Sequence, residues 1–431
     1  MDNSAPRNSH IRWLLISCIF LISAIAYLDR VNVSIAGSAI AGEFHLTNQQ
    51  LGWIFSAFIL GYAIFQAPGG SLADKIGPRK TLTIGVIWWG VFTALITAIS
   101  GSAGGLIVSL IAIRFLLGVG EAVVYPASNC IVAAWIPSSE RGIANGIIFA
   151  GVGFGAGITS PIVAYLVMNY GWRSAFWASA IPGLVAAAIW YLIARDRPVE
   201  HPWVTSRELA LIESGIPKTG SGAGARLSWS SILRNLNVWA VTFSYFTYGY
   251  AAYIFFSWFF IYLSTVRKLN MRESSYYTML PPLAMAIGSP LGGWISDRLT
   301  ERWGKRVGRC LLAAATIAAC GVFIVFAMQA ENARVASVVL AGGAGCLYLS
   351  QSSFWSISAD IGKGSAGSVS GFMNMGGQFG GALTASLTPA IAAHLGWSAS
   401  FVVAGCLCGA GALAWLIVRP EPVPAEAATA V

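Results

Sequence analysis

The chain has 431 residues, of which 56% are hydrophobic and only 10% are charged. This composition lies far outside the range of soluble proteins and indicates a protein that crosses a membrane many times. The formal net charge is +9, but no basic stripe interleaved with aromatic residues marks a soluble domain, so nucleic-acid binding is not indicated.

Runs of about 18 to 25 mostly apolar residues recur along the chain, and each is long enough to cross a hydrocarbon core about 30 Å thick. Long apolar runs predict helices, because a barrel would show short alternating strands. The first run is too long for a cleavable signal and lacks a small-residue cleavage site. The twelve predicted spans lie near 13–35, 51–72, 81–99, 106–135, 143–168, 174–194, 237–263, 276–296, 309–328, 335–358, 367–393 and 397–418.

Lys and Arg residues are distributed unevenly between the predicted loops. With the N-terminus inside, 19 of the 26 lie on the cytoplasmic side, five lie outside and two, Arg30 and Arg114, lie within spans. Both termini are therefore predicted to face the cytoplasm. Short outer loops fit a bacterial protein, so we expect a multi-pass protein of the inner (plasma) membrane.

The seven Cys residues all lie in apolar spans, where they behave as small hydrophobic side chains. The four His residues are scattered over span ends and loops. Neither a disulfide framework nor a metal site is indicated, and no cofactor is expected.

The first span contains two adjacent charged residues, Asp29 and Arg30, in the stretch AIAYLDRVNVSIAG. Tyr27 and Arg30 share a helix face by their spacing of three, whereas Asp29 points about 100° away from Arg30, so the acid and the base need not neutralise each other. Arg30 is then free to hold an anion, to which its planar guanidinium offers two parallel hydrogen bonds. The alternative is a purely structural Asp29–Arg30 pair that fixes helix packing.

The fourth span carries Arg114 and Glu121, which lie on one helix face with Gly118 between them. Charged residues at membrane depth are costly, so they are expected to face a partner or a wet cavity. A buried carboxylate resists ionisation, so Asp29 or Glu121 could bind and release a proton. The charged residues of these two spans therefore predict a proton-coupled anion carrier, and an Arg114–Glu121 bridge without a proton role is the alternative.

The only long polar stretch between spans, 195–235, separates six spans from six. An offset near 225 aligns GVGEA with GAGCL, NGIIFAGVGFGAG with SGFMNMGGQFGGA, and YGWRSAFW with LGWSASFV. We therefore predict two related six-helix bundles, a first half at 1–194 and a second half at 236–431 with a short cytoplasmic tail, joined by a cytoplasmic linker at 195–235.

A repeated motif, GGSLADKIGPRK at 69–80, is echoed by GGWISDRLTERWGKR at 292–306. The first copy resembles the loop between the second and third helices of the major facilitator superfamily, with the pattern G-x-L-A-D-[RK]-x-G-x-[RK]. The residues that match this pattern are Gly70, Asp74, Gly77, Arg79 and Lys80. With twelve spans in two groups of six, the resemblance covers the whole chain and implies an all-α fold of two pseudo-symmetric bundles.

This motif predicts a gate between the two bundles. An aspartate at a helix end, tied to backbone amides or to a basic side chain across the interface, holds the bundles together in one state and releases them in the other. We assign Asp74, Gly70 and Arg79 of the first copy and Asp297 of the second copy to this gate. The alternative is that the charged residues of the motif only cap helices and enforce topology.

Three further stretches, YLDRVNVSIA, RFLLGVGEAVVYPA and GFMNMGGQFGGAL, resemble the anion:cation symporter branch of the superfamily. That branch includes bacterial carriers for galactonate, glucarate and hexuronates, and it is related to animal sialic acid and vesicular glutamate carriers. The resemblance implies that Arg30, with Tyr27, binds a substrate carboxylate. It also implies that protons exchange at Asp29 and Glu121, and that Arg114 pairs with Glu121.

Two later spans supply further candidate residues. The resemblance implies substrate contact by Asn374 in the eleventh span, and helical spacing adds Gln378 one turn further on; interhelical hydrogen bonding is the alternative for Asn374. The seventh span is dense in aromatic rings, of which Tyr253 and Trp258 could line a cavity. Packing against lipid or at the membrane interface is the alternative for these two rings.

These features predict a secondary active transporter that carries an organic anion, a sugar acid or another small carboxylate, together with protons by alternating access. The fifth span has only Gly and apolar residues where sugar-acid carriers often have a polar side chain, so an aromatic or short carboxylate is also open. A facilitator or an anion exchanger of the same fold is the alternative. No catalytic motif and no large soluble domain is present, so an enzyme or a sensor is not expected. The expected partners are the anion, protons and the bilayer, and we expect a monomer.

Overall fold

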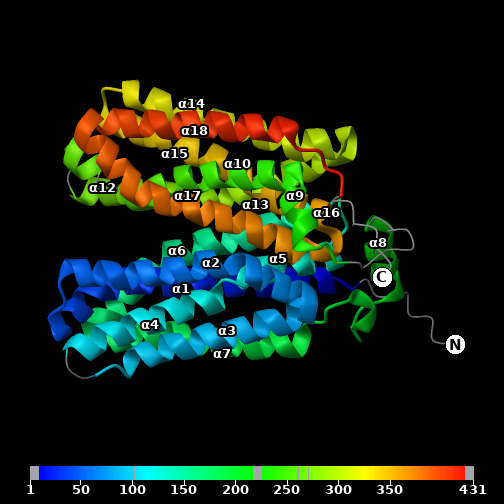
Figure 1. The fold of residues 1–431 in the computed structure, drawn as a ribbon, viewed down its shortest axis with the longest axis horizontal. Coiled ribbons are helices and arrows are strands. Elements are labelled where there is room, and N and C mark those ends of the chain that lie inside the picture. The colour runs from blue at the N-terminus through cyan, green and yellow to red at the C-terminus, as the bar shows by residue number, and fades with distance from the viewer. Residues whose placement is uncertain (1–8, 101–102, 217–225, 260–261, 270, 423–431) are drawn as a thin grey trace.

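The computed structural model describes residues 9–100, 103–216, 226–259, 262–269 and 271–422, and every regular element in these ranges is a helix. Two groups of long helices lie against each other with their axes roughly aligned (Figure 1). Helices α1 to α7 form the lower group in this view, and α10 to α18 form the upper group. The predicted all-α fold is confirmed.

The first half consists of seven helices that account for its six predicted spans. The fourth span is divided in two directly after Glu121, because Pro126 cannot donate to the carbonyl of Ala122 and its ring would clash with that group. The helices are α1 (Ile11–Phe44), α2 (Asn48–Ile76), α3 (Pro78–Thr97), α4 (Ala103–Glu121), α5 (Val124–Trp135), α6 (Arg141–Tyr170) and α7 (Trp172–Ile193).

The second half contains corresponding interruptions. Its first helix, α10 (Leu236–Tyr253), continues as two π-helical segments, η2 (Ile254–Trp258) and η3 (Tyr262–Val266), and its tenth predicted span is divided at Ser350. The other elements are α12 (Met271–Thr278), α13 (Leu280–Lys305), η4 (Arg306–Leu311), α14 (Leu312–Gln329), α15 (Ala333–Leu349), α16 (Gln351–Gly362), η5 (Lys363–Ser365), α17 (Ala366–Leu395) and α18 (Trp397–Ile417).

Three pairs of corresponding helices in the two halves begin with the same offset. Helices α1, α6 and α7 begin at residues 11, 141 and 172, and α10, α17 and α18 begin at residues 236, 366 and 397, which is 225 residues later in each case. Nine helical segments of the described residues are long and apolar enough to cross a membrane. Two of these, Tyr276–Gln329 and Ala333–Leu395, are each long enough to cover two predicted spans.

The linker elements η1 (Pro198–Glu200), α8 (Ser206–Gly215) and α9 (Trp229–Arg234) lie at one end of the molecule, which we call the linker end. The start of α1 and the end of α18 lie at this same end, at the right of Figure 1. Glu208 of α8 accepts hydrogen bonds from the backbone N–H groups of Ile11 at 3.1 Å and Arg12 at 3.2 Å. The linker therefore caps the first helix and ties it in place.

Candidate functional site

A cavity of about 60 Å³ lies between the two groups of helices and is lined by residues of both. The first half contributes Tyr27 of α1, Tyr62 of α2 and Tyr125 of α5. Seven tyrosines and three side-chain amides form most of the polar lining, and the lining contains no charged side chain. Neutral hydrogen-bonding groups of this kind can orient a polar solute without binding a fixed charge.

Four of the predicted substrate-binding residues line this one cavity: Tyr27, Tyr253, Asn374 and Gln378. The Tyr253 hydroxyl donates to Gln378 Oε1 at 3.0 Å. Asn374 Nδ2 donates to Gln66 Oε1 of α2 at 2.9 Å, so Asn374 also makes the interhelical hydrogen bond that was its alternative interpretation. The other ring named for the seventh span does not line the cavity, because Trp258 donates to the carbonyl of Thr384 at 3.3 Å.

Arg30 lies directly behind the cavity wall. Its guanidinium carbon is 4.0 Å from the ring centroid of Tyr62 and 4.9 Å from that of Tyr27, and both rings line the cavity. Its Nε donates to Glu121 Oε1 at 2.6 Å, in an ion pair whose acid is fully buried. A short charge-assisted bond with little exposure is a strong interaction.

The predicted pairing of Arg114 with Glu121 is wrong, because Glu121 pairs with Arg30 instead. Seven residues of helix place the two side chains on one face, but they also separate them by about 10.5 Å along the axis. Arg30 of α1 reaches Glu121 from another helix and is therefore the partner that helical spacing had assigned to Arg114.

Arg114 is a second buried cation, with 4% exposure. Its guanidinium carbon is 4.6 Å from the ring centroid of Phe58, and that of Arg30 is 5.3 Å from the same centroid. Among the described residues, Nε and Nη1 of Arg114 have no hydrogen-bond partner. The Phe58 ring therefore contacts both guanidinium groups, and Arg114 retains donors that could bind an anion.

Asp29 points away from Arg30, as its position on the helix predicts. Its carboxylate accepts from Thr93 Oγ1 of α3 at 2.8 Å and from Ser179 Oγ of α7 at 3.0 Å. The side chain is buried within the first half and does not line the cavity. The two candidate proton sites thus differ, because Glu121 contacts the arginine behind the cavity and Asp29 contacts neutral hydroxyls.

The two halves are joined at the linker end through Asp74, near the end of α2. Its carboxylate accepts from the backbone N–H groups of Gly367 at 3.0 Å and Ser368 at 2.7 Å, and from the Ser368 hydroxyl at 2.6 Å. These donors belong to the first turn of α17, where unpaired N–H groups and the helix dipole favour an anion. A Cβ atom on Gly70 would lie 1.9 Å from the carbonyl oxygen of Gly367, so only glycine allows this approach.

Asp297 of α13 makes the equivalent contact in the opposite direction. It accepts from the backbone N–H groups of Gly142 at 2.9 Å and Ile143 at 2.8 Å, in the first turn of α6. Each half therefore extends an aspartate to a helix start in the other half. Both aspartates thus bind backbone amides across the interface, and their role as a gate stays a prediction.

Arg79 does not take part in these contacts. Its backbone N–H donates to Asp196 at 2.8 Å, and its guanidinium donates to the carbonyl of Tyr191 at 3.0 Å and 2.7 Å. Both partners lie at the end of the first half or directly after it. The assignment of Arg79 to the gate is therefore corrected, because its side chain ties α3 to the end of α7 within one group of helices.

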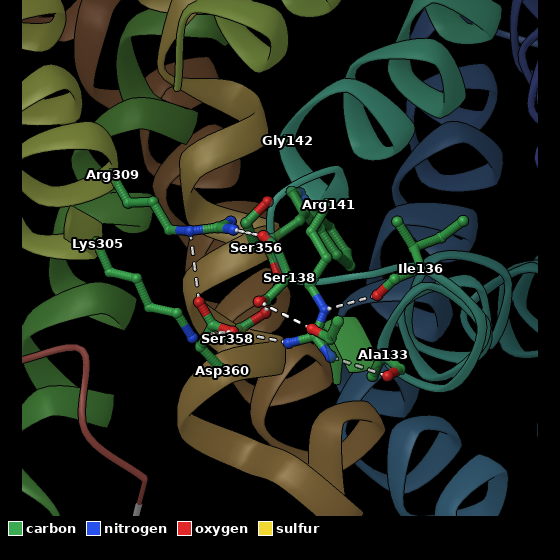
Figure 2. A network of polar contacts seen from close by, with 12 residues as sticks. Ala133, Ile136, Ser138, Arg141, Gly142, Lys305, Arg309, Ser356, Ser358 and Asp360 are labelled. Carbon is green, nitrogen blue, oxygen red and sulfur yellow. Dashed lines mark hydrogen bonds and ion pairs between the residues drawn. The ribbon is translucent and has the colours of Figure 1, made fainter. Parts of the chain in front are cut away.

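A further ionic network at the linker end was not predicted (Figure 2). Asp360 of α16 binds Arg141 Nη1 at 2.7 Å and Lys305 Nζ at 3.0 Å through Oδ1, and Arg309 Nε at 3.4 Å through Oδ2. Arg309 also donates to the carbonyl of Ser138. The network joins α6 of the first half to α13, η4 and α16 of the second. The sequence feature that could have indicated this network is Asp360 itself, a single acidic residue two positions beyond the predicted end of the tenth span.

A fold of two helix groups with a central polar cavity between them, charges buried beside it and contacts that join the groups at one end, defines a membrane carrier. A model of the Major Facilitator Superfamily matches residues 19–385. The chain belongs to this superfamily, whose members are transporters, and it is not an enzyme.

Proteins whose sequences are similar to this chain are named as transporters. The probable sulfoacetate transporter SauU of Cupriavidus necator is 34% identical over 415 residues, with 95% of this chain and 94% of that protein covered. The hexuronate transporter of Bacillus subtilis is 31% identical over 418 residues, with 95% and 96% covered. The probable galactarate/D-glucarate transporter GudP of Bacillus subtilis is 34% identical over 307 residues, with 69% and 67% covered.

Solved structures of the same fold include the proton:xylose symporter XylE, with a TM-score of 0.75, 16% identity and coverage of 97% of this chain and 98% of that chain. The Escherichia coli fucose:proton symporter FucP has a TM-score of 0.69, also at 16% identity, with 95% and 98% covered. At this level of identity the two structures establish the fold.

Proposed function

We propose that this protein is a proton-coupled symporter of a small organic anion. The observation that carries the proposal is the buried Arg30–Glu121 ion pair, with its 2.6 Å bond directly behind Tyr27 and Tyr62 of the cavity wall. A guanidinium at this place attracts an anion into a cavity whose own lining is neutral.

Coupling to protons follows from competition for Arg30. When a substrate carboxylate binds the guanidinium, it weakens or replaces the bond to Glu121. Glu121 is then a buried carboxylate that has lost its counter-charge, and this is the condition under which the neutral, protonated form is favoured. Substrate binding and proton binding therefore assist each other, and release of the proton on the other side restores the ion pair and expels the anion.

Asp29 and Arg114 have supporting roles in this scheme. Asp29 can accept a second proton from within the first half, where Thr93 and Ser179 hold its carboxylate. Arg114 shares the Phe58 ring with Arg30. It can therefore move toward whichever of the two acids is ionised, or toward the substrate itself.

Alternating access requires that the two halves, 1–194 and 236–431, rock against each other around the cavity. The contacts of Asp74, Asp297 and Asp360 close the linker end, which we place on the cytoplasmic side of the inner membrane together with both termini. In this arrangement the described conformation is closed toward the cytoplasm, and breaking these contacts opens the exit path.

The substrate class is an organic acid small enough for a tyrosine-lined cavity. The similar proteins are named for sulfoacetate, hexuronate and galactarate or glucarate, and each of these compounds carries a carboxylate, with a sulfonate, hydroxyls or a second carboxylate beside it. We place the substrate of this protein in the same class, with its carboxylate on Arg30.

The test is uptake of these acids into proteoliposomes that contain the purified protein, with and without an inward proton gradient. The wild type is expected to accumulate at least one acid only when the gradient is present. Glu121→Gln is expected to abolish gradient-driven accumulation while counterflow survives, and Asp29→Asn is expected to do so only for an acid whose uptake requires a second proton. Glu301→Gln, which alters a half-exposed acid at the end of α13, is the control and should behave as the wild type.

Uptake at the same rate with and without the proton gradient would contradict symport and favour a facilitator. Counterflow of two different anions without proton movement would favour an exchanger. If no organic acid exchanges or accumulates in any condition, the anion-binding role of Arg30 is wrong.

A further inference from the structure

Three tyrosine hydroxyls of the cavity lining have no hydrogen-bond partner among the described residues: those of Tyr125 on α5, Tyr248 on α10 and Tyr348 on α15. Their side chains are 3%, 5% and 1% exposed. A buried hydroxyl without a partner is costly, and native proteins contain few of them. Three around one cavity therefore indicate a group that the cavity is built to receive.

Other polar groups of the same lining are engaged. The Tyr245 hydroxyl accepts from Gln351 Nε2 at 3.0 Å and from Trp355 Nε1 at 3.3 Å, and the Tyr253 hydroxyl donates to Gln378. Because Gln351 gives an N–H to Tyr245, its Oε1 is left without a partner among the described residues. The described lining of the cavity therefore has one unpaired acceptor, Gln351 Oε1, in addition to the three unpaired hydroxyls.

These groups come from a different part of the wall than the arginine. Arg30 lies behind Tyr27 of α1 and Tyr62 of α2, whereas the unpaired groups come from α5, α10, α15 and α16. The rings of Tyr248 and Tyr348 have centroids 6.4 Å apart, so two of the hydroxyl-bearing side chains are direct neighbours. The unpaired neutral groups therefore come from elements of the cavity wall other than α1 and α2, whose rings cover Arg30.

We propose that Tyr125, Tyr248, Tyr348 and Gln351 form a second polar subsite, which binds an oxygen-bearing group at the end of the substrate opposite its carboxylate. This inference rests on the proposed function and names its substrate class: short bifunctional acids that end in a carboxylate, a sulfonate or a hydroxyl. Phenol hydroxyls donate to such oxygens without adding a positive charge. A site built to hydrogen-bond a substrate group can reject an analogue that lacks it by about 10⁴-fold or more.

The experiment compares acids that differ at one end only. Binding of succinate, sulfoacetate and 4-hydroxybutyrate is measured against that of butyrate, by calorimetry on the purified full chain in nanodiscs. At least one bifunctional acid is expected to bind 10-fold or more tightly than butyrate, and the three terminal groups distinguish a carboxylate, a sulfonate and a hydroxyl subsite. Tyr125→Phe, Tyr248→Phe and Tyr348→Phe are each expected to reduce this preference by about 5- to 10-fold, because the affinity for the bifunctional acid falls more than the affinity for butyrate.

Tyr250→Phe is the matched control, because Tyr250 is fully buried on the same helix as Tyr248 but does not line the cavity. Melting temperatures equal to that of the wild type show that the variants are folded, and Tyr125 and Tyr348 lie on different halves, so each tests the subsite independently.

If the three variants keep the wild-type preference, the hydroxyls only hydrate the cavity and the subsite is wrong. The proposed function then still stands, provided that binding depends on Arg30. If no acid of the set shows Arg30-dependent binding, the proposed function fails and the subsite fails with it.

Discussion

Arg30 contacts a carboxylate and two tyrosine rings at once, and this combination depends on the shape of its side chain. The planar guanidinium places Nε 2.6 Å from Glu121 while its faces lie against Tyr62 and Tyr27. Lysine would keep the positive charge. Its compact ammonium cannot, however, stack on the two rings, bind Glu121 and offer further donors to a substrate carboxylate at the same time. Charge alone is therefore not sufficient at this position.

We accordingly expect Arg30→Lys to weaken binding of the transported acid by about 10- to 100-fold, the effect of losing one or two charge-assisted hydrogen bonds. Calorimetric titration of the purified protein measures this change. Arg298→Lys, at an exposed position of α13, is the control. Equal affinities of Arg30→Lys and the wild type would show that the substrate does not bind the guanidinium.

For the candidate site, the sequence predicted which side chains share a face of one helix. It did not predict which side chains of different helices contact each other. The spacing of Tyr27, Asp29 and Arg30 correctly predicted that the ring shares the face of the arginine and that the acid turns away. The same reasoning gave Glu121 the wrong partner, because it considers one helix at a time. Gln66, which accepts a hydrogen bond from Asn374, was not predicted as a site residue, because its apolar segment contains no motif or charged residue that indicates a site.

Two pairs of helices, α2 with α17 and α6 with α13, join the two halves at the linker end. Both pairs rely on an aspartate that binds the first turn of the opposite helix, and in both a glycine lies where the backbones meet. The predicted gate positions of Asp74 and Asp297 could be read from a local motif. The Asp360 network could not, because Arg141, Lys305 with the nearby Arg309, and Asp360 come from three distant parts of the sequence.

Cys130 gives a native reporter of this closure, since its thiol is buried and donates to Asp74 Oδ1 at 3.3 Å. We expect Asp74→Asn to weaken the bonds to α17 and to increase the rate of maleimide labelling of Cys130 by about 10-fold, the effect of about 1.4 kcal/mol. Peptide mass spectrometry separates Cys130 from the other cysteines. Glu301→Gln should leave the rate unchanged, and a protected Cys130 in Asp74→Asn would mean that Asp74 does not hold the gate.

Gly70→Ala tests the same interface by steric means. The added methyl group would overlap the carbonyl of Gly367, so the end of α2 must move away from α17 and the closed state is destabilised. We expect faster labelling of Cys130, by about 10-fold or more. Gly52→Ala on the same helix has open space around its Cβ position and should have no effect. Equal rates in both variants would contradict a tight approach at Gly70.

Helix α8 stabilises the start of α1 through Glu208. Burial opposes ionisation of this carboxyl, but hydrogen bonds from Ser9, Arg12 and Ile11 and the charge of Arg12 outweigh it and hold the pKa of Glu208 below its usual value of 4.5. Because the pKa of Glu208 is lower in the folded state than in the unfolded state, the ionised carboxylate stabilises the folded protein at pH values above the usual pKa. That stabilisation is lost as the pH falls through the lowered pKa.

Glu208→Gln should therefore reduce the free energy of unfolding by roughly 1–3 kcal/mol at neutral pH. Its melting temperature should approach that of the wild type as the pH falls below about 4.5. Differential scanning fluorimetry of detergent-solubilised protein measures both. Glu213→Gln, at an exposed position of the same helix, is the control. A melting-temperature difference that does not change with pH would contradict the role of the ionised carboxylate.

At the scale of the whole molecule, the repeat in the sequence accounts for most of the architecture. The offset near 225 predicted which helices correspond, and the starts of three pairs agree with it, α1 with α10, α6 with α17 and α7 with α18. The breaks at residues 122–123 and 350 and the change from α- to π-helix at residue 254 were not predicted, since each lies within an apolar run that is long enough to span a membrane unbroken. These breaks come next to residues of the cavity lining or of the ion pair behind it: Tyr125, Tyr253, Gln351 and Glu121.

The two halves contribute unequally to the chemistry. Asp29, Arg30, Arg114 and Glu121 all belong to the first half, whereas the second half supplies neutral amides and phenols to the cavity. In the proposed scheme the first half binds the substrate carboxylate through Arg30, and the groups proposed to bind the other end come mostly from the second half, with Tyr125 of the first half among them. We expect substitutions in the second half to change which acid is preferred, and substitutions in the first half to change how transport is driven.

The equal number of acids and bases beside the cavity has a consequence for energetics in a polarised membrane. Their formal charges sum to zero, so a monoanion that enters with one proton leaves the core neutral throughout the cycle. Moving one net charge across the bilayer would cost or yield about 2.3 kcal/mol per 100 mV, and this carrier avoids that dependence for a monoanion. We expect its uptake to respond to a pH difference but not to a voltage imposed with valinomycin and potassium. A dianion that enters with a single proton should instead be slowed by a negative interior, unless Asp29 brings the second proton.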